Sequence, residues 1–223
     1  DCDWAPANTV YRLRSHPPIE TVPSFRDGLF YIQDPSTLLS VDLLNPKSGQ
    51  AVLDLCAAPG GKTGLIAERM NNEGQLTATD TSDSRLGLLR ENCERLGVTC
   101  ATLGQAEAVL ADATPRFDRA LVDVPCSNTG VMRRRLDLRW RISPEETRYL
   151  TDTQLRLLAR AAGFVRPGGA LVYSTCSIEP EENEQIVKRF LEENTGWQLE
   201  TERTLHPVED HTDGAYAARL TKD

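Results

Sequence analysis

Short apolar runs alternate along this chain with stretches in which apolar residues recur every three or four positions. The short runs predict β-strands, and the three-to-four spacing predicts amphipathic helices. The predicted strands cover residues 51–55, 75–79, 98–103, 119–124, 170–174, 197–201 and 215–220, with a further short strand over 28–33. The predicted helices cover residues 36–44, 64–70, 84–96, 144–162 and 181–193.

Strands that alternate with helices over most of a chain are typical of a doubly wound α/β fold. We therefore predict a Rossmann-like sheet of about seven strands with helices on both faces. In such sheets, ligands bind outside the carboxyl ends of the strands. The residues that directly follow each predicted strand are the candidates for a functional site.

The loop after strand 51–55 is rich in glycine. Residues 54–63 have the sequence Asp-Leu-Cys-Ala-Ala-Pro-Gly-Gly-Lys-Thr and lead into a predicted helix. The N–H groups of such a loop and the positive end of the helix suit a polar or anionic ligand. Gly60 and Gly61 allow that ligand to approach the backbone. The loop matches neither the Walker phosphate loop nor the dinucleotide G-x-G-x-x-G pattern.

Asp80 ends the next predicted strand. A carboxylate at this position can accept hydrogen bonds from the ribose hydroxyls of a nucleoside. The loop and Asp80 together therefore indicate a nucleoside cofactor. Taken alone, Asp80 is equally well interpreted as a helix cap or a solvated acid.

Composition narrows the class of protein. With 25 basic and 33 acidic residues the net charge is −8, so a nucleic-acid partner needs a local basic surface. No apolar run approaches the roughly 20 residues of a membrane span, and the first residues do not resemble a secretory signal. We therefore expect a cytoplasmic protein. The six cysteines form no C-x-x-C pair, which argues against a disulfide framework or a zinc ribbon.

Two further strand ends carry unusual residues, Asp-Val-Pro-Cys-Ser-Asn-Thr-Gly over 123–130 and Ser-Thr-Cys-Ser-Ile-Glu-Pro over 174–180. If these strands lie beside the first, Cys56, Cys126 and Cys176 share one edge of the sheet. A cysteine in an α/β protein is usually a small buried hydrophobe, but two thiols beside a cofactor loop indicate chemistry. A zinc site is the alternative. It lacks a convincing fourth ligand, because the three histidines lie in flanking segments.

Three blocks of the sequence, residues 53–63, 123–130 and 173–183, closely resemble motifs of the RNA cytosine-5 methyltransferases of the Sun/Fmu and nucleolar Nop type. The resemblance extends over about residues 22–220 and includes the approach at 28–34 and Asp-Gly at 213–214. It implies a class I methyltransferase fold, S-adenosylmethionine as cofactor, and methylation of carbon 5 of a cytosine in RNA, with ribosomal RNA as the expected substrate.

The resemblance also implies a role for four residues. Cys176 is the nucleophile that adds to carbon 6 of cytosine and makes carbon 5 reactive toward a methyl group. Cys126 assists release of the methylated adduct. Asp123 hydrogen-bonds the base at N3 and its amino edge, and donates to N3 if a desolvated site keeps its carboxyl group neutral. Lys62 contacts the cofactor or Asp123.

The cofactor contacts expected on this basis are Cys56, Ala57, Ala58, Pro59, Gly60, Gly61, Lys62, Asp80, Gln105 and Asp123. This chain departs from the family pattern at the expected contact to the adenine of the cofactor. The family places an aspartate after the third strand, whereas this chain has Leu-Gly-Gln-Ala-Glu over 103–107. Gln105 or Glu107 is the candidate replacement, and the two stay open alternatives.

A basic segment follows the Cys126 loop. Residues 131–141 carry five arginines and one acid, a local charge of +4 in an acidic chain. Arginine pairs with phosphate and tryptophan stacks on bases, so the expected RNA contacts are Arg133, Arg134, Arg135, Arg139 and Trp140. A solvated basic loop is the alternative. The target cytosine is expected to be flipped out, because its ring carbons are unreachable in a stack.

Residues 1–35 are rich in proline and lack periodicity. We expect them to be the end of an N-terminal RNA-binding extension, with residues 36–223 forming the catalytic domain of a monomer that holds no metal. The alternatives are a non-catalytic RNA-binding or ribosome-assembly protein, a tRNA-directed enzyme and a DNA cytosine methyltransferase. Pure binding needs neither thiol, and a DNA enzyme is expected to use Cys126 as nucleophile and to lack the block around Cys176.

Overall fold

The computed structural model describes residues 9–15, 17–111, 114–140 and 142–223. Arg141 of the basic segment lies outside the described residues, as do residues 1–8 of the expected extension.

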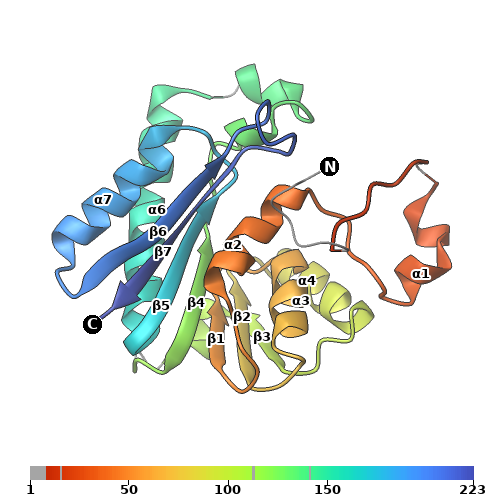
Figure 1. Ribbon diagram of the computed structural model, residues 1–223, viewed down its shortest axis with the longest axis horizontal. Helices are drawn as coiled ribbons and strands as arrows, with labels where there is room; N and C mark the ends of the chain where they lie inside the picture. Colours follow the sequence, from red (N-terminus) through yellow and green to blue (C-terminus); the bar gives the residue numbers. More distant parts are fainter. Residues whose placement is uncertain (1–8, 16, 112–113, 141) are drawn as a thin grey trace.

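Seven strands form one sheet in the order β3-β2-β1-β4-β5-β7-β6 (Figure 1). Their bounds are β1 Ala51–Asp54, β2 Gln75–Asp80, β3 Ala101–Gln105, β4 Phe117–Asp123, β5 Val165–Thr175, β6 Trp197–Leu205 and β7 Ala215–Lys222. The pairs from β3 to β5 are parallel, and β7 is antiparallel to both β5 and β6. The strand order reverses between β1 and β4, so the crevice that binds ligands in such sheets lies at their carboxyl ends. The predicted fold class is confirmed.

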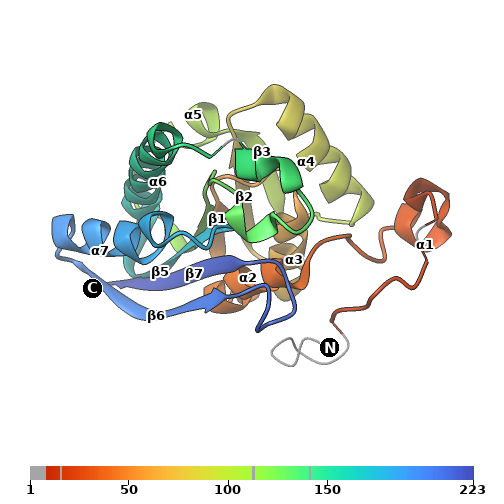
Figure 2. The ribbon, with the colours of Figure 1, turned by 90° about the horizontal axis from the view of Figure 1, so that it is seen from above.

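Helices cover both faces of this sheet. Their bounds are α1 Pro23–Arg26, α2 Leu38–Leu44, α3 Gly61–Arg69, α4 Asp83–Arg95, α5 Ala106–Val109, α6 Pro144–Phe164 and α7 Glu184–Glu193. The helices α2, α3 and α4 pack on one face, and α5, α6 and α7 pack on the other. Figure 2 shows α2 and α6 on opposite sides of the strands.

Alternation along the central strands explains these two layers. On β4, Leu121 packs in the cluster with Leu44 of α2 and Ile66 of α3, whereas its neighbour Val122 packs with Leu158 of α6. Successive side chains of a strand point to opposite faces, so strands buried on both sides carry continuous apolar runs.

The described helices include none that is long and apolar enough to cross a membrane.

Local signals set the ends of several helices. The Ser82 and Ser143 side chains accept hydrogen bonds from the first turns of α4 and α6, as N-caps do. Pro144 occupies the first turn of α6, where its missing N–H costs nothing. Asn45 ends α2 with a left-handed backbone at φ 48°, a conformation that asparagine tolerates better than most residues.

Several boundaries differ from the predictions. Residues 28–33 form no strand; Gly28 lies in a turn with φ 74°, and the Phe30 carbonyl accepts a hydrogen bond from the Arg95 guanidinium instead of a strand neighbour. The helix predicted from 181 begins at Glu184, because residues 180–182 form the 3₁₀ helix η5 (Pro180–Glu182). The strand β5 begins at Val165, before the predicted start at residue 170, and residues 166–169 lie within it as an irregularity in its pairing with β4.

Candidate active site

Two cysteines meet at the carboxyl ends of the adjacent strands β4 and β5. Asp123 pairs with Ser174 in the β4–β5 register, so the loops that follow the two strands begin side by side. The Sγ atoms of Cys126 and Cys176 lie 3.1 Å apart. Cys126 is buried, with 7% of its surface exposed, and Cys176 is half-buried. The structure therefore brings together the two thiols that were predicted to share one edge.

The two thiols are not equivalent. The hydrogen bond to Cys176 and burial raise the pKa of Cys126 well above its usual value. Cys126 therefore holds its proton at neutral pH. Cys56, the third thiol of this edge, lies in the cofactor loop, where burial and the Asp54 charge raise its pKa to about 12. Because the thiolate is the nucleophilic form, Cys56 is unsuited to nucleophilic attack.

Asn128 connects both cysteine loops. Its Nδ2 donates to the Cys126 carbonyl over 2.7 Å, and its Oδ1 accepts from the Cys176 thiol over 3.0 Å. The backbone of Asn128 is left-handed, with φ 61°, which turns the side chain back toward both strand ends. Sequence reasoning assigned no role to Asn128 although it lies in the 123–130 block, because only the folded loop brings its amide to Cys176.

An ion pair lies beside the thiols. Lys62 Nζ is 2.6 Å from Asp123 Oδ2, and the Ser174 hydroxyl donates to Asp123 Oδ1 over 2.7 Å. Burial lowers the pKa of Lys62, but the charge and hydrogen bond of Asp123 outweigh it, so the net pKa is raised. Donation from a neutral Asp123 to N3 stays a prediction, while in the folded protein Asp123 accepts from both of these neighbours. Both of its oxygens accept hydrogen bonds, and the proton of the pair lies on Lys62.

A cavity of about 300 Å³ opens next to this ion pair. Among the predicted cofactor contacts, seven line it: Cys56, Ala57, Ala58, Pro59, Gly61, Lys62 and Asp123. The buried Asp54 also lines it, and its Oδ1 has no hydrogen-bond partner among the described residues. Its Oδ2 accepts from the Thr63 hydroxyl, and burial raises the pKa of Asp54 to about 7.

Three other predicted cofactor residues lie outside the lining of this cavity, namely Gly60, Asp80 and Gln105. The Asp80 carboxylate accepts from backbone N–H groups of the loop and of the start of α4 and pairs with Arg85. Gln105 Nε2 donates to Asp83 over 2.7 Å, and Glu107 pairs with Arg160 of α6 over 3.0 Å. The structure therefore gives both adenine candidates another partner.

The segment before α2 supplies residues to which sequence reasoning assigned no role. Tyr31, Gln33 and Asp34 line the same cavity, together with Asp213 from the β6–β7 connection. A Cβ atom on Gly61 would lie 2.5 Å from the Tyr31 ring, so the glycine is needed for this close approach. Both segments belong to the region that resembles the methyltransferase family, and this resemblance was the one feature of the sequence that could have pointed to these residues.

Two of the predicted RNA-binding arginines share a pair of buried carboxylate partners. Arg133 pairs with Asp34 at 2.9 Å and Asp213 at 2.6 Å, and Arg134 contacts the same two aspartates. We call these four residues the arginine–aspartate cluster. It ties the segment before α2 to the loop after β4 and to the β6–β7 connection, and it cancels much of the positive charge predicted there.

The remaining arginines and the tryptophan of the basic segment that the structure describes are also exposed to solvent. Arg135 lies 3.9 Å from Asp137, and Trp140 is 84% exposed. Both lie in or beside the 3₁₀ helix η4 (Leu136–Trp140), which also carries Arg139. An exposed tryptophan between arginines has the composition of a stacking surface for bases. The described part of the chain holds no group of three His, Cys, Asp or Glu residues able to bind a metal.

Comparisons with known proteins point to one family. The family model for the 16S rRNA methyltransferases RsmB/F matches residues 41–221. The probable ribosomal RNA small subunit methyltransferase B of Synechocystis is 37% identical over 92% of this chain and 50% of its own length. Its Bacillus subtilis counterpart is 41% identical over 76% of this chain and 39% of its own length. The chain thus spans about half or less of these relatives.

Solved structures show the same likeness. The crystal structure of PH0851 superposes with a TM-score of 0.89 at 31% identity, over 93% of this chain and 50% of that one. The structure of NSun6 from Pyrococcus horikoshii with SFG has a TM-score of 0.84 at 31% identity, over 93% of this chain and 56% of that one.

Proposed function

Because this chain belongs to the RsmB/F family of 16S rRNA methyltransferases, we propose that it methylates carbon 5 of a cytosine in ribosomal RNA, with S-adenosylmethionine as methyl donor. The relatives named ribosomal RNA small subunit methyltransferase B support this substrate. The relative solved with SFG, an S-adenosylmethionine analogue, supports this cofactor. The observation that carries the proposal is the pair of thiols 3.1 Å apart beside a cavity.

The two thiols divide the work in this mechanism. The thiolate of Cys176 adds to carbon 6 of the cytosine and forms a C–S bond, while the ring electrons move toward carbon 5 and N3 and N3 takes a proton from Lys62. After methyl transfer, carbon 5 carries a proton and the new methyl group. The thiolate of Cys126 removes that proton, the C–S bond breaks and returns its electrons to the Cys176 sulfur, the ring double bond is restored, and N3 gives its proton back to Lys62.

The pKa of Cys126 favours this order of events. In the resting pair, the hydrogen bond to Cys176 and burial hold the pKa of Cys126 high. Once the Cys176 sulfur is bonded to carbon 6 it is a neutral thioether without an S–H group, so the part of the shift that this hydrogen bond causes disappears. Cys126 therefore loses its own proton more readily after the adduct has formed, when its thiolate is needed as a base.

The Lys62–Asp123 pair supplies the proton for N3. Lys62 carries that proton and lies 2.6 Å from Asp123, whose carboxylate is suited to accept from the amino group of the cytosine. As N3 gains negative charge during Cys176 attack, the ammonium stabilises it. Asn128 holds the Cys176 thiol in place through its Oδ1.

The residues around the cavity fit S-adenosylmethionine. The unpartnered Asp54 Oδ1 can accept from an ammonium group, and the volume lies at the lower end of the range for small-molecule sites. When bound, the cofactor supplies an electrophilic methyl group. The loop 56–62 would hold it, and contacts from Asp80 and Gln105 stay predictions.

The RNA would approach across η4. We propose Arg135, Arg139 and Trp140 as its main contacts in this segment, because Arg133 and Arg134 are held by the arginine–aspartate cluster. RNA binding by residues 1–35, a monomeric state and a cytoplasmic location belong to the same proposal.

Substitution of each cysteine tests the mechanism. Methyl transfer from labelled S-adenosylmethionine to a 16S rRNA transcript, and covalent protein–RNA species on denaturing gels, are the two measurements. Cys176→Ala should lose both methylation and adduct. Cys126→Ala should accumulate a methylated adduct, because a positioned base accelerates its breakdown by about 10²–10⁴-fold.

Cys56→Ala is the matched control and should still turn over, because its thiol takes no part in either step. An adduct in Cys176→Ala and none in Cys126→Ala would exchange the two roles. Full methylation in both variants would refute covalent catalysis.

A further inference from the structure

We propose that Glu182 is a positioning residue that holds the two catalytic cysteines in register by binding the serine that follows each of them. The inference rests on the proposed two-thiol mechanism and adds a residue to it. Glu182 belongs to η5, immediately before α7, and its side chain is completely buried beneath the two cysteine loops.

The Glu182 carboxylate accepts four hydrogen bonds. Its Oε1 accepts from the Ser127 backbone N–H and from Gln154 Nε2, each over 2.9 Å. Its Oε2 accepts from the hydroxyls of Ser127 and Ser177, the latter over 2.5 Å. Ser127 directly follows Cys126, and Ser177 directly follows Cys176. One side chain therefore holds both loops, each one residue away from its thiol.

Neighbouring contacts make this anchor rigid. Gln154 of α6 also donates to the Pro125 carbonyl over 3.0 Å. Asn183, next to Glu182, donates to the Ser177 carbonyl over 3.0 Å and accepts from the Thr175 hydroxyl over 2.6 Å. The backbone carbonyl of Glu182 accepts from the Tyr173 hydroxyl. Glu182 is thus fixed from both strand ends and from α6.

The number of donors explains why a carboxylate is required. An ionised carboxylate only accepts hydrogen bonds and offers both oxygens, whereas a glutamine has one accepting oxygen and a donating NH₂ group. A buried carboxylate is stable only when its lone pairs are satisfied, as the four donors achieve here. Glutamine would fit the space, but its NH₂ group would face at least one of the four groups that donate hydrogen bonds to Glu182.

For catalysis, the Glu182 anchor affects the distance between the two sulfurs more than the binding of the cofactor. Cys176 holds the base while Cys126 reaches carbon 5, so the distance between the thiols governs adduct breakdown. Glu182 does not line the cofactor cavity. A misplacement of about 1 Å can cost on the order of 10²-fold in rate. Loss of the anchor should therefore lower kcat while leaving cofactor affinity unchanged.

Glu182→Gln tests this proposal in the intact protein. We expect kcat to fall by about 10- to 100-fold, with KM for the RNA transcript and Kd for S-adenosylmethionine within about threefold of wild type. The adduct should accumulate, as in Cys126→Ala, because breakdown is the step that needs both thiols aligned. Glu182→Asp, which restores the charge one methylene short, should recover part of the rate.

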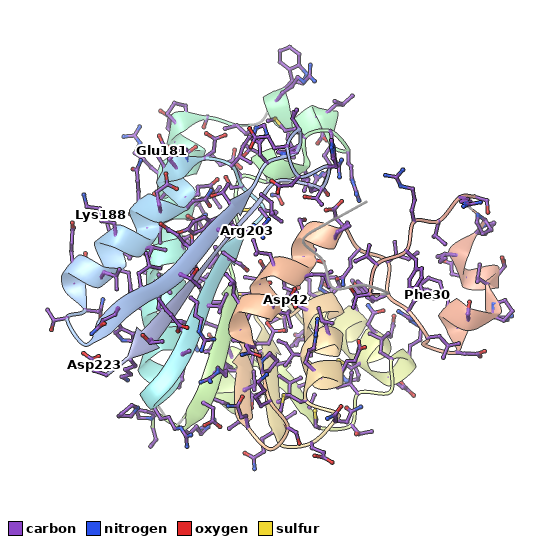
Figure 3. The ribbon with its side chains drawn as sticks, in the orientation of Figure 1. Phe30, Asp42, Glu181, Lys188, Arg203 and Asp223 are labelled. Atoms are coloured by element: carbon purple, nitrogen blue, oxygen red, sulfur yellow. The ribbon has the colours of Figure 1, made fainter. Side chains whose placement is uncertain are left out.

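Glu181→Gln is the matched control, because Glu181 is the exposed neighbour of Glu182 on the same segment (Figure 3). It should behave as wild type. If Glu182→Gln does not fold, Ser127→Ala removes one tether only and should show the same fall in kcat with adduct accumulation.

Two results would overturn the inference. One is wild-type kcat in a folded Glu182→Gln variant. The other is parallel loss of kcat, cofactor affinity and thermal stability in both Glu182→Gln and Ser127→Ala, which would make the anchor a general structural element. Absence of methylation in the wild-type protein would instead refute the proposed function, so the two failures are distinguishable.

Discussion

Replacing Asp34 by asparagine should destabilise the protein through the arginine–aspartate cluster. Asp34 is buried, and its Oδ1 accepts from the backbone N–H groups of Ser36 and Asp213 over 3.0 and 2.8 Å. Its Oδ2 accepts from Arg133 and Arg134. Asparagine keeps the Oδ1 contacts but places an NH₂ group opposite the two guanidinium groups.

The size of the effect follows from these contacts. Asparagine cannot form the two hydrogen bonds to charged groups, each worth about 1.5–3 kcal/mol. The arginine side chains are 40% and 54% exposed, so they regain water and the destabilisation is reduced by roughly half. A net destabilisation of about 2 kcal/mol is expected, which lowers Tm by about 4–8 °C in a protein of this size.

Urea denaturation at pH 7 measures this destabilisation. The control is Asp42→Asn on α2, where Figure 3 labels Asp42. It breaks the pair with Arg69 at 3.0 Å and should change stability by less than about 1 kcal/mol. If Asp34→Asn is no less stable than Asp42→Asn, the cluster does not hold the three segments together and the reasoning fails.

Two further predictions concern RNA binding and pH. Neutralising Arg135 and Arg139 with glutamine should lower the slope of log affinity against log salt by about 0.7–0.9 for each arginine–phosphate pair that is removed, measured by fluorescence anisotropy with an RNA transcript; an unchanged slope would place the RNA elsewhere. Burial raises the pKa of Asp54 from 3.8 to about 7, so the folded state keeps a proton that the unfolded chain releases. Stability should therefore fall by up to about 4 kcal/mol as pH rises from about 4 to 7. Urea denaturation at pH 4.5 and 7 should show this component in the wild type and not in Asp54→Asn, and equal pH dependence in both would refute it.

Helices and strands that are determined by neighbouring residues were predictable from the sequence. The helix α6 carries its own start signal at Ser143 and Pro144, and the alternation of apolar runs with helical spacing indicated the doubly wound sheet. Residues 28–33 were mistaken for a strand because their conformation depends on Arg95, 65 positions away from Phe30. Propensity alone does not report such distant partners.

In the candidate site, too, some features were predictable from the sequence and others were not. The strand-end blocks located Cys126 and Cys176, because parallel strands bring their carboxyl ends to one edge. The partners of Arg133 were not predictable, since Asp34 and Asp213 lie 99 and 80 positions away. An arginine cluster looks the same in sequence when it binds phosphate and when it binds aspartate.

The position of β7 has a consequence for synthesis of the protein. The strand β5, which leads to Cys176, pairs with β4 on one side and with β7 on the other. Forty positions separate Thr175 from Ala215, where β7 begins. At about 5–20 residues per second, this edge of β5 stays open on the ribosome for roughly 2–8 seconds. During that interval, before the two thiols are held in place, an apolar strand edge is exposed to pairing with other nascent chains.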